Sequence, residues 1–241
     1  DASGLDVTKT FVFRADNYVA DLSVKLSKGG QPMPNAKLLI GASIGDQAIP
    51  HHNFYHIEPE AVAHVNDSVY RSQGAGYTFD ANNQSSIPVP GNIDWAGVGD
   101  AYFAMAAIPA QRAQGLEYRA TKYEFPTEPF YDGIISWVTR SQKTSETRHL
   151  ITAYVPITTD GTATKIFTGT KDYFALSGPY TESLSQSTGR RIELVDLINF
   201  SNYSWIRPIT KTLSIPIIYS LNFFNNLTNN YGVAIIVFTF L

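Results

Sequence analysis

The sequence has no cysteine, few charged residues and only one strongly apolar run, at its very end. The absence of cysteine from 241 residues excludes disulfides, thiolate metal ligands and a thiol nucleophile. Charged residues make up 16% of the chain and the formal net charge is −3, so a basic surface is missing and we expect no nucleic acid partner. Residues 1–4 lack the basic start and apolar core of a signal peptide, so we expect targeting for export to depend on a segment outside this sequence.

Motifs that carry catalysis are also missing. The sequence contains no Gly-x-Ser-x-Gly elbow, phosphate loop or dinucleotide fingerprint. His51, His52 and His56 have metal-like spacing, but they fall in a predicted loop, and we interpret them as surface residues rather than zinc ligands. Glu58 and Glu60 flank a proline, an arrangement more typical of a solvated loop than of an acid–base pair. We therefore predict no enzymatic activity, no cofactor and no metal.

The chain does contain many short segments in which apolar and polar residues alternate. Residues 6–14 and 18–26 alternate with the period of two that is typical of strands, and residues 35–44 form a third predicted strand. Similar segments, separated by Gly, Asn and Pro turns, continue through residue 142. Strands at this spacing predict an all-β fold, an antiparallel sandwich.

Two details refine this expectation. Asp160-Gly161 lies between the alternating residues 149–158 and 162–168, which predicts a hairpin. Before the C-terminal tail only two helical pieces are expected, near residues 171–176 and 192–198.

The character of the chain changes in its last part. No charged residue follows Lys211, and residues 231–241 are almost purely apolar. Eleven helical residues rise about 16 Å, roughly half of a ~30 Å bilayer core. A buried core strand is the other interpretation of such a run, but we predict the first half of a transmembrane helix. The predicted transmembrane residues are Val233, Ile235, Ile236, Val237, Phe238 and Thr239.

The preceding segment predicts an amphipathic helix. Apolar residues recur every three or four positions from Ile206 to Phe224 and so share one helical face. Because proline cannot continue a regular helix, we place the N-cap at Ser214 and Pro216 in the first turn. Such a helix suits a membrane surface, and packing on the sheet is equally compatible with this segment alone. The predicted membrane-interface residues are Ile217, Leu221, Phe224 and Tyr231.

Four stretches, in order along the chain, resemble the periplasmic domain of the YidC family of membrane-protein insertases. Residues 94–109 resemble its Trp-x-Gly-x-x-Asp-Lys-Tyr-Phe…Pro signature, with Ala101 where the family has lysine. Residues 4–11 are similar to an early strand, and residues 166–173 to a Leu-Tyr-x-Gly-Pro-Lys-x-Tyr segment. Residues 216–239 resemble the Pro…Asn-Trp-Gly…Thr stretch, with Tyr231 in place of tryptophan. The signature residues, to which we assign structural roles, are Trp95, Gly97, Asp100, Tyr102, Phe103, Pro109, Gly169, Lys171, Pro216 and Gly232.

This resemblance implies a twisted antiparallel β-super-sandwich, similar in shape to galactose mutarotases, followed by an amphipathic helix. The implied segments are a periplasmic β-sandwich domain at 1–198 that lacks the family's first strands, a linker and interfacial helix at 199–230, and the start of the second transmembrane helix at 231–241. The resemblance also implies a protein of the bacterial inner membrane, with this domain facing the periplasm. Its implied partners are nascent membrane proteins, membrane lipid and the Sec translocon (SecYEG and SecD–SecF).

A second hypothesis comes from another functional class. A carbohydrate-binding or mutarotase-like sandwich would use Trp95, Trp137 and nearby carboxylates to stack on and bond to a sugar. The apolar residues 233–241 favour the membrane hypothesis, because a soluble sugar-binding domain has no use for them.

Overall fold

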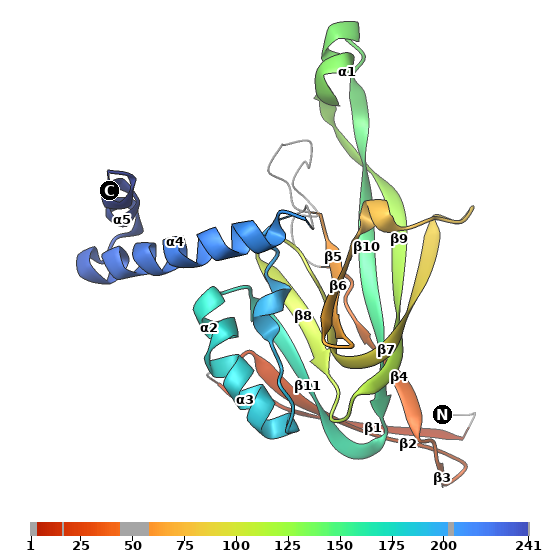
Figure 1. Ribbon diagram of the computed structural model, residues 1–241. Helices are drawn as coiled ribbons and strands as arrows, with labels where there is room; N and C mark the ends of the chain where they lie inside the picture. Colours follow the sequence, from red (N-terminus) through yellow and green to blue (C-terminus); the bar gives the residue numbers. More distant parts are fainter. Residues whose placement is uncertain (1–3, 16, 44–57, 202–204, 241) are drawn as a thin grey trace. The chain divides into compact units, whose positions relative to one another are not determined.

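The computed structural model of the protein describes residues 4–15, 17–43, 58–201 and 205–240 (Figure 1). The chain divides into two compact units, Asp1–Leu197 and Ile198–Leu241. The first unit consists mainly of β-strands and the second of two helices. The predicted fold class, antiparallel β with a C-terminal helix, is confirmed.

The first unit is an 11-stranded network in which every paired strand runs antiparallel to its neighbour. Its main path is β1-β2-β11-β8-β7-β9-β10-β4, with β3 on β2, and with β5 on β7 and β6. The strands are β1 (Leu5–Val12), β2 (Val19–Lys28), β3 (Gln31–Pro32), β4 (Asn35–Ile40), β5 (Glu60–Val65), β6 (Ser68–Gln73), β7 (Gln84–Gly99), β8 (Phe103–Ile108), β9 (Ala113–Phe130), β10 (Lys143–Thr158) and β11 (Asp160–Thr170). Because all strands are linked, the division into the two sheets of a super-sandwich stays a prediction.

The predicted strands at the start of the chain correspond to β1, β2 and β4. β1 pairs with β2 from Leu5↔Lys28 to Val12↔Asp21. β2 buries Val19, Leu22 and Val24, whereas most of β1 is exposed.

The hairpin predicted at Asp160-Gly161 is wrong. β10 pairs with β9 and β4, whereas β11 pairs with β2 and β8. The link between β10 and β11 is held by β2 and by the residue after β3, since the Thr159 carbonyl accepts from Leu26 N at 3.3 Å and its hydroxyl donates to the Met33 carbonyl. Asp160 and Gly161 therefore begin β11, and the chain turns a corner between two parts of the sheet at Thr159. A short-range turn signal does not distinguish such a corner from a hairpin.

A true two-residue hairpin joins β5 and β6. Asn66 and Asp67 both have positive φ, 49° and 60°, and the register closes at Val65↔Ser68. Two successive positive φ values define a type I′ turn, whose twist matches that of the flanking strands.

The main core lies between β4, β5, β7, β8, β9 and β10. Tyr118 is fully buried there, and its hydroxyl donates to the carbonyls of Val62 (2.8 Å) or Gly97 (3.1 Å), so this ring joins three strands. The other buried members are Ile40, Ala61, Ala63, Val65, Tyr77, Val89, Ile93, Ala96, Val98, Ala107, Ala113, Leu116, Ala120, Ile151, Ala153 and Val155.

Short helices supplement the strands of the first unit. The piece expected near 171–176 is α2 (Tyr173–Ser177), and the piece expected near 192–198 is a 3₁₀ turn, η2 (Leu194–Leu197). The prediction missed α3 (Pro179–Thr188) and α1 (Gly133–Thr139), as well as the 3₁₀ turn η1 (Gly74–Gly76). α3 lies close to β11 and to the start of β2. The ring of Tyr180 on α3 contacts Phe167 on β11 and Tyr18, the residue before β2.

The second unit contains α4 (Arg207–Thr228) and α5 (Tyr231–Thr239). The predicted start of the first helix is wrong: Pro208 occupies its first turn, and Ser214 and Pro216 lie inside it. Proline fits the first turn of a helix because the amide there has no intrahelical partner. Pro216 lies in the helix interior although it has no amide to donate to the preceding turn. The prediction took the cost of that missing hydrogen bond to exclude an interior proline.

Candidate functional site

The Trp-x-Gly-x-x-Asp signature forms the end of β7 and the turn into β8. Asp100 Oδ1 accepts hydrogen bonds from the backbone amides of Tyr102 and Phe103, both at 2.8 Å. The Asp100 amide in turn donates to the Phe103 carbonyl at 3.0 Å. The aspartate at this position therefore closes the turn, a role for which its short acceptor side chain is suited.

A buried cluster of charges lies next to this turn. It contains Glu60, which is fully buried at the start of β5, so the solvated loop predicted around Glu58 and Glu60 is wrong for Glu60. Glu60 Oε1 accepts from Arg71 Nη1 at 2.7 Å and from Lys171 Nζ at 3.3 Å. Lys171 Nζ also donates to the Asp100 carbonyl at 2.6 Å, and its amide donates to the Tyr102 carbonyl at 2.7 Å. Burial lowers the pKa of Lys171, while Glu60 opposes that shift. Lys171 thus connects the signature turn to β5.

Two signature glycines lie where elements approach closely. A Cβ atom at Gly97 would lie 2.8 Å from the Cβ of Ala106 on β8, and one at Gly169 would lie 2.8 Å from the ring of Tyr18. Glycine is needed at both positions for space between neighbouring segments.

A second buried carboxylate, Asp94, joins the first signature residues to the end of the unit. Its oxygens accept from His64 Nδ1 at 3.1 Å and Arg112 Nε at 2.9 Å, and Arg190 Nε lies 3.5 Å away. Arg190 Nη2 donates to the Pro109 carbonyl at 2.7 Å. The structure thus brings the signature residues of the first unit, Trp95 to Lys171, onto β7, β8 and β11 and the adjoining turns.

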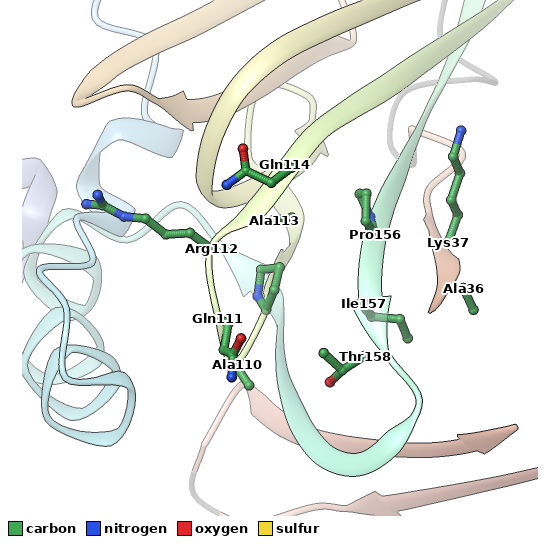
Figure 2. Close-up of a pocket in the computed structure, with 11 residues that line it drawn as sticks. Ala36, Lys37, Ala110, Gln111, Arg112, Ala113, Gln114, Pro156, Ile157 and Thr158 are labelled. Carbon is green, nitrogen blue, oxygen red and sulfur yellow. The ribbon is translucent and has the colours of Figure 1, made fainter. Parts of the chain in front are cut away.

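An open groove of about 630 Å³ lies beside this region, between the β8–β9 turn and the end of β10 (Figure 2). Pro156, Ile157 and Thr158 form one wall, and Lys37 lies on the neighbouring β4. The residues from Ala110 to Gln114 form the other wall. The Arg112 side chain points away from the first wall in this view, and its Nε donates to Asp94. The described lining contains no aromatic ring and no carboxylate, the two kinds of group that the carbohydrate hypothesis invokes.

A more polar groove of about 460 Å³ lies elsewhere on β9 and β10 and includes Glu117, Arg119 and Tyr154. Glu117 accepts from Lys37 and Arg119, both at 2.7 Å, and from Ser86 at 2.9 Å. These hydrogen bonds, the one from Lys37 first, lower the pKa of Glu117 to about 2. The carboxylate is therefore fully ionised and held in place at neutral pH.

The structure does not support the shared tryptophan surface of the carbohydrate hypothesis. Trp95 is completely buried and stacks on His64, with ring centroids 6.4 Å apart. Trp137 lies on α1 and is 67% exposed. A buried ring and an exposed ring cannot stack on the same sugar, so this pairing is wrong.

Sequence reasoning missed the most exposed apolar element of the first unit. α1 lies at the tip of the β9–β10 hairpin, and none of its residues is buried (Figure 1). The signal was present in the Asp132-Gly133 turn followed by apolar residues at helical spacing, but the helix is only seven residues long.

The predicted membrane-interface residues lie on α4 and at the start of α5. No residue of α4 is buried, and Ile217 and Tyr231 are exposed, whereas Leu221 and Phe224 are partly covered. Phe224 and Phe238, together with Tyr219 and Phe223, line a shallow pocket between the two helices. The helix pair therefore leaves much of its own apolar surface uncovered.

The predicted transmembrane residues all lie on α5. Asn230 caps this helix by accepting from the amides of Gly232 (2.8 Å) and Val233 (3.3 Å). A side chain at Gly232 would approach that capping oxygen to 3.1 Å, which gives a reason for the small residue. α5 is apolar on all sides. Among the described residues, no helix combines the length and apolar character required to cross a membrane.

The three histidines considered as metal ligands lie outside the described residues. Within the part of the chain that the structure describes, no group of three or more His, Asp or Glu side chains could hold a metal ion.

Comparison with known proteins gives one family. Residues 1–215 match the family described as YidC periplasmic domain. Two proteins named membrane protein insertase YidC are similar across 96% of this chain, that of Chlorobaculum parvum at 24% identity and that of Chlorobaculum tepidum at 23%. A protein of the same name from Cereibacter sphaeroides is 24% identical over 61% of this chain.

Fold and site together define an antiparallel β unit in which Asp100 of the Trp-x-Gly-x-x-Asp signature closes the β7–β8 turn. The chain belongs to the YidC periplasmic domain family. It spans about a third of the length of the two Chlorobaculum relatives, 34% in each.

Proposed function

We propose that this chain is the periplasmic portion of a membrane-protein insertase of the bacterial inner membrane. In this proposal the protein assists insertion and folding of nascent membrane proteins, as a chaperone, either alone or beside the Sec translocon. The observation that carries it is the family match over residues 1–215, together with relatives named as insertases.

The second unit supports a position at a membrane. α4 has a broad apolar face that its own unit leaves open, and α5 is apolar on all sides. A helix that is apolar all round is stable only when buried in protein or lipid. We assign α4 to the membrane interface and α5 to the start of a transmembrane segment, with the first unit in the periplasm.

The benefit to a substrate would be physical rather than chemical. Moving a polar or charged segment into lipid costs several kcal/mol for each unsatisfied group, and an insertase lowers that cost. The proposal therefore includes no bond-making step, no cofactor and no metal. In the described part of the chain, the polar groups of the signature turn and of the charge clusters serve turn closure and charge pairing.

The proposed partners are nascent membrane proteins, lipid, and the Sec components SecYEG and SecD–SecF. A photoreactive amino acid at Ile217 of the protein, produced in bacterial cells, tests this. We expect crosslinks to newly made membrane proteins, which should disappear when translation is stopped. We also expect crosslinks to Sec components, which should disappear when the translocon is depleted.

The same photoreactive residue at Lys9, on the exposed strand β1, is the matched control for random collision. Crosslinks from Ile217 only to soluble periplasmic proteins, or equal crosslinks from both positions, would contradict the proposal.

A further inference from the structure

The β9–β10 hairpin carries an apolar helix at its end, away from the core. β9 pairs with β7 only as far as Gln84↔Thr121, and from there to Phe130 its described partner is β10. Those nine residues extend about 25–30 Å at the rise of a β-strand. Figure 1 shows the hairpin extending beyond the rest of the first unit, with α1 at its tip.

The four large apolar side chains of α1 are all exposed to an unusual degree. Ile134 and Ile135 are each 81% exposed, Trp137 is 67% and Val138 is 66%. At 100° per residue these four lie on one side of the helix, and Ser136 and Thr139 lie on the other. The apolar side of α1 therefore faces solvent.

Three polar groups of the tip form hydrogen bonds within the tip. The hydroxyl of Ser136 donates to the Gly133 carbonyl at 2.9 Å, and that of Thr139 donates to the Ile135 carbonyl at 2.9 Å. The Ser141 amide closes the helix end by donating to the Ser136 carbonyl at 3.0 Å. These three groups can enter a low-dielectric environment without losing hydrogen bonds to water, while the uncapped first turn and Arg140 suit the polar headgroup region.

The charges at the base of the tip favour an anionic surface. Asp132 pairs with Lys143, and Arg140 follows α1 with no acidic partner among the described residues. Residues 130–143 thus hold two basic residues and one acidic residue, and the next acidic residue, Glu128, lies back along β9. Tyr131 and Trp137 add the amphipathic rings that are typical of a membrane interface.

The size of the tip favours lipid over a protein partner. A seven-residue helix is only about 10 Å long, and a stable protein interface needs about 800 Å² from each partner. Insertion into a bilayer surface needs only a few aliphatic and aromatic side chains with basic neighbours.

We propose that the α1 tip, Ile134, Ile135, Trp137 and Val138 with Arg140 at its edge, inserts into the headgroup and acyl boundary of an anionic lipid bilayer. This goes beyond the proposed function, because it concerns a different surface and depends on neither α4 nor α5. It assigns the first unit a lipid contact of its own.

Fluorescence of Trp137 in the whole chain tests the proposal. In a Trp205→Phe background the remaining tryptophans are Trp137 and the completely buried Trp95. With vesicles of phosphatidylethanolamine and phosphatidylglycerol that carry brominated acyl chains, we expect a blue shift and quenching of Trp137. Replacing Trp137 itself with Phe should abolish the quenched component. In Arg140→Gln the apparent affinity for the vesicles, measured from the quenching of Trp137, should fall about fivefold. This is the effect of one basic residue near an anionic surface.

In Ile135→Asp the apparent affinity for the vesicles, measured from the quenching of Trp137, should fall at least about tenfold. The variant removes one inserted apolar side chain and adds a charge. Val12→Asp, at a 49% exposed position on β1, adds the same charge elsewhere and should leave the quenching unchanged. Unchanged melting temperatures establish that both variants fold.

Vesicle binding without quenching of Trp137 would overturn the proposal, because the chain would then bind through α4 and α5 alone. Full quenching in Ile135→Asp would also overturn it. A third outcome is that lipid vesicles leave Trp137 unquenched while self-association of the chain shifts its emission to the blue. That result would overturn the proposal and identify α1 as a protein contact instead.

Discussion

Single residues of the first unit act mainly as connections between strands. Glu60 joins β5 to Arg71 on β6 and to Lys171 after β11, all three with side chains less than 10% exposed. Lys171 continues this connection to the carbonyl of Asp100. A buried charge pair gives little net stability but is costly to break, because the remaining partner keeps an uncompensated charge.

This geometry predicts an order of damage. Glu60→Gln leaves two buried cations facing a neutral amide and should lower the free energy of unfolding by about 3–5 kcal/mol. Lys171→Met should be milder, because Glu60 keeps its 2.7 Å bond to Arg71. Urea unfolding followed by circular dichroism measures both, and a larger loss in Lys171→Met than in Glu60→Gln would contradict the assigned roles.

Glu117 gives a prediction about acid. Its pKa is about 2 in the folded state, below the ordinary value of 4.5. A carboxylate with a depressed pKa contributes stability that is complete above its unfolded pKa and is lost as the pH falls toward the folded value. Between pH 5 and pH 2.5 the protein should therefore lose more stability than Glu117→Gln, which lacks this ionisation.

Urea midpoints at the two pH values measure this difference. The other carboxylates titrate equally in both proteins, so they cancel in the comparison. Parallel loss of stability in the two proteins would show that Lys37 and Arg119 do not hold the ionised form.

At the scale of elements, sequence reasoning succeeded where a pattern was long and local. β1 and β2 followed from their alternation, and the long apolar helical segment before Asn229 was recognised. The start of that helix was misplaced because the rule against interior proline was applied to Pro216, whereas Pro208 already supplied the first turn.

Non-local information explains the other differences. The Asp160-Gly161 turn has the residues of a hairpin, and only the pairing of β11 with β2 and β8 shows that it is a corner. The signature positions were recognised as structural, but no spacing in the sequence indicates that Lys171 meets Glu60, 111 residues away. Trp95 and Trp137 were grouped as two aromatic residues, although burial separates them.

The two prolines of α4 give a matched test of the helix. Pro216→Ala restores an amide in the helix interior and removes the clash with the preceding turn, worth about 3 kcal/mol in helix propensity. Pro208→Ala restores an amide in the first turn, where no intrahelical acceptor exists. Hydrogen exchange of the amides of α4 should therefore slow markedly in the first variant and little in the second.

Exchange in the β-strands of the first unit should not change in either variant. Equal effects of the two substitutions, or no effect of Pro216→Ala, would indicate that the helix is interrupted near residue 216.

At the scale of the whole molecule, the two units differ in how they treat apolar side chains. The first buries its apolar residues in a strand-built core and fixes the family signature around the β7–β8 turn. The second leaves apolar side chains of α4 and α5 exposed, including Ile217, Tyr231 and Ile236. Such exposure is unfavourable in water and becomes favourable when lipid covers it.

The central claim is that the second unit meets a membrane, and vesicle flotation of Ile217→Asp tests it most directly. Ile217 is 42% exposed on a helix with no buried residue, so the substitution should barely change the melting temperature of the β unit. Transfer of one apolar side chain to lipid contributes about 1.5–3 kcal/mol, so vesicle binding should fall by at least about tenfold. A fall in melting temperature typical of a core lesion, with vesicle binding unchanged, would contradict the claim.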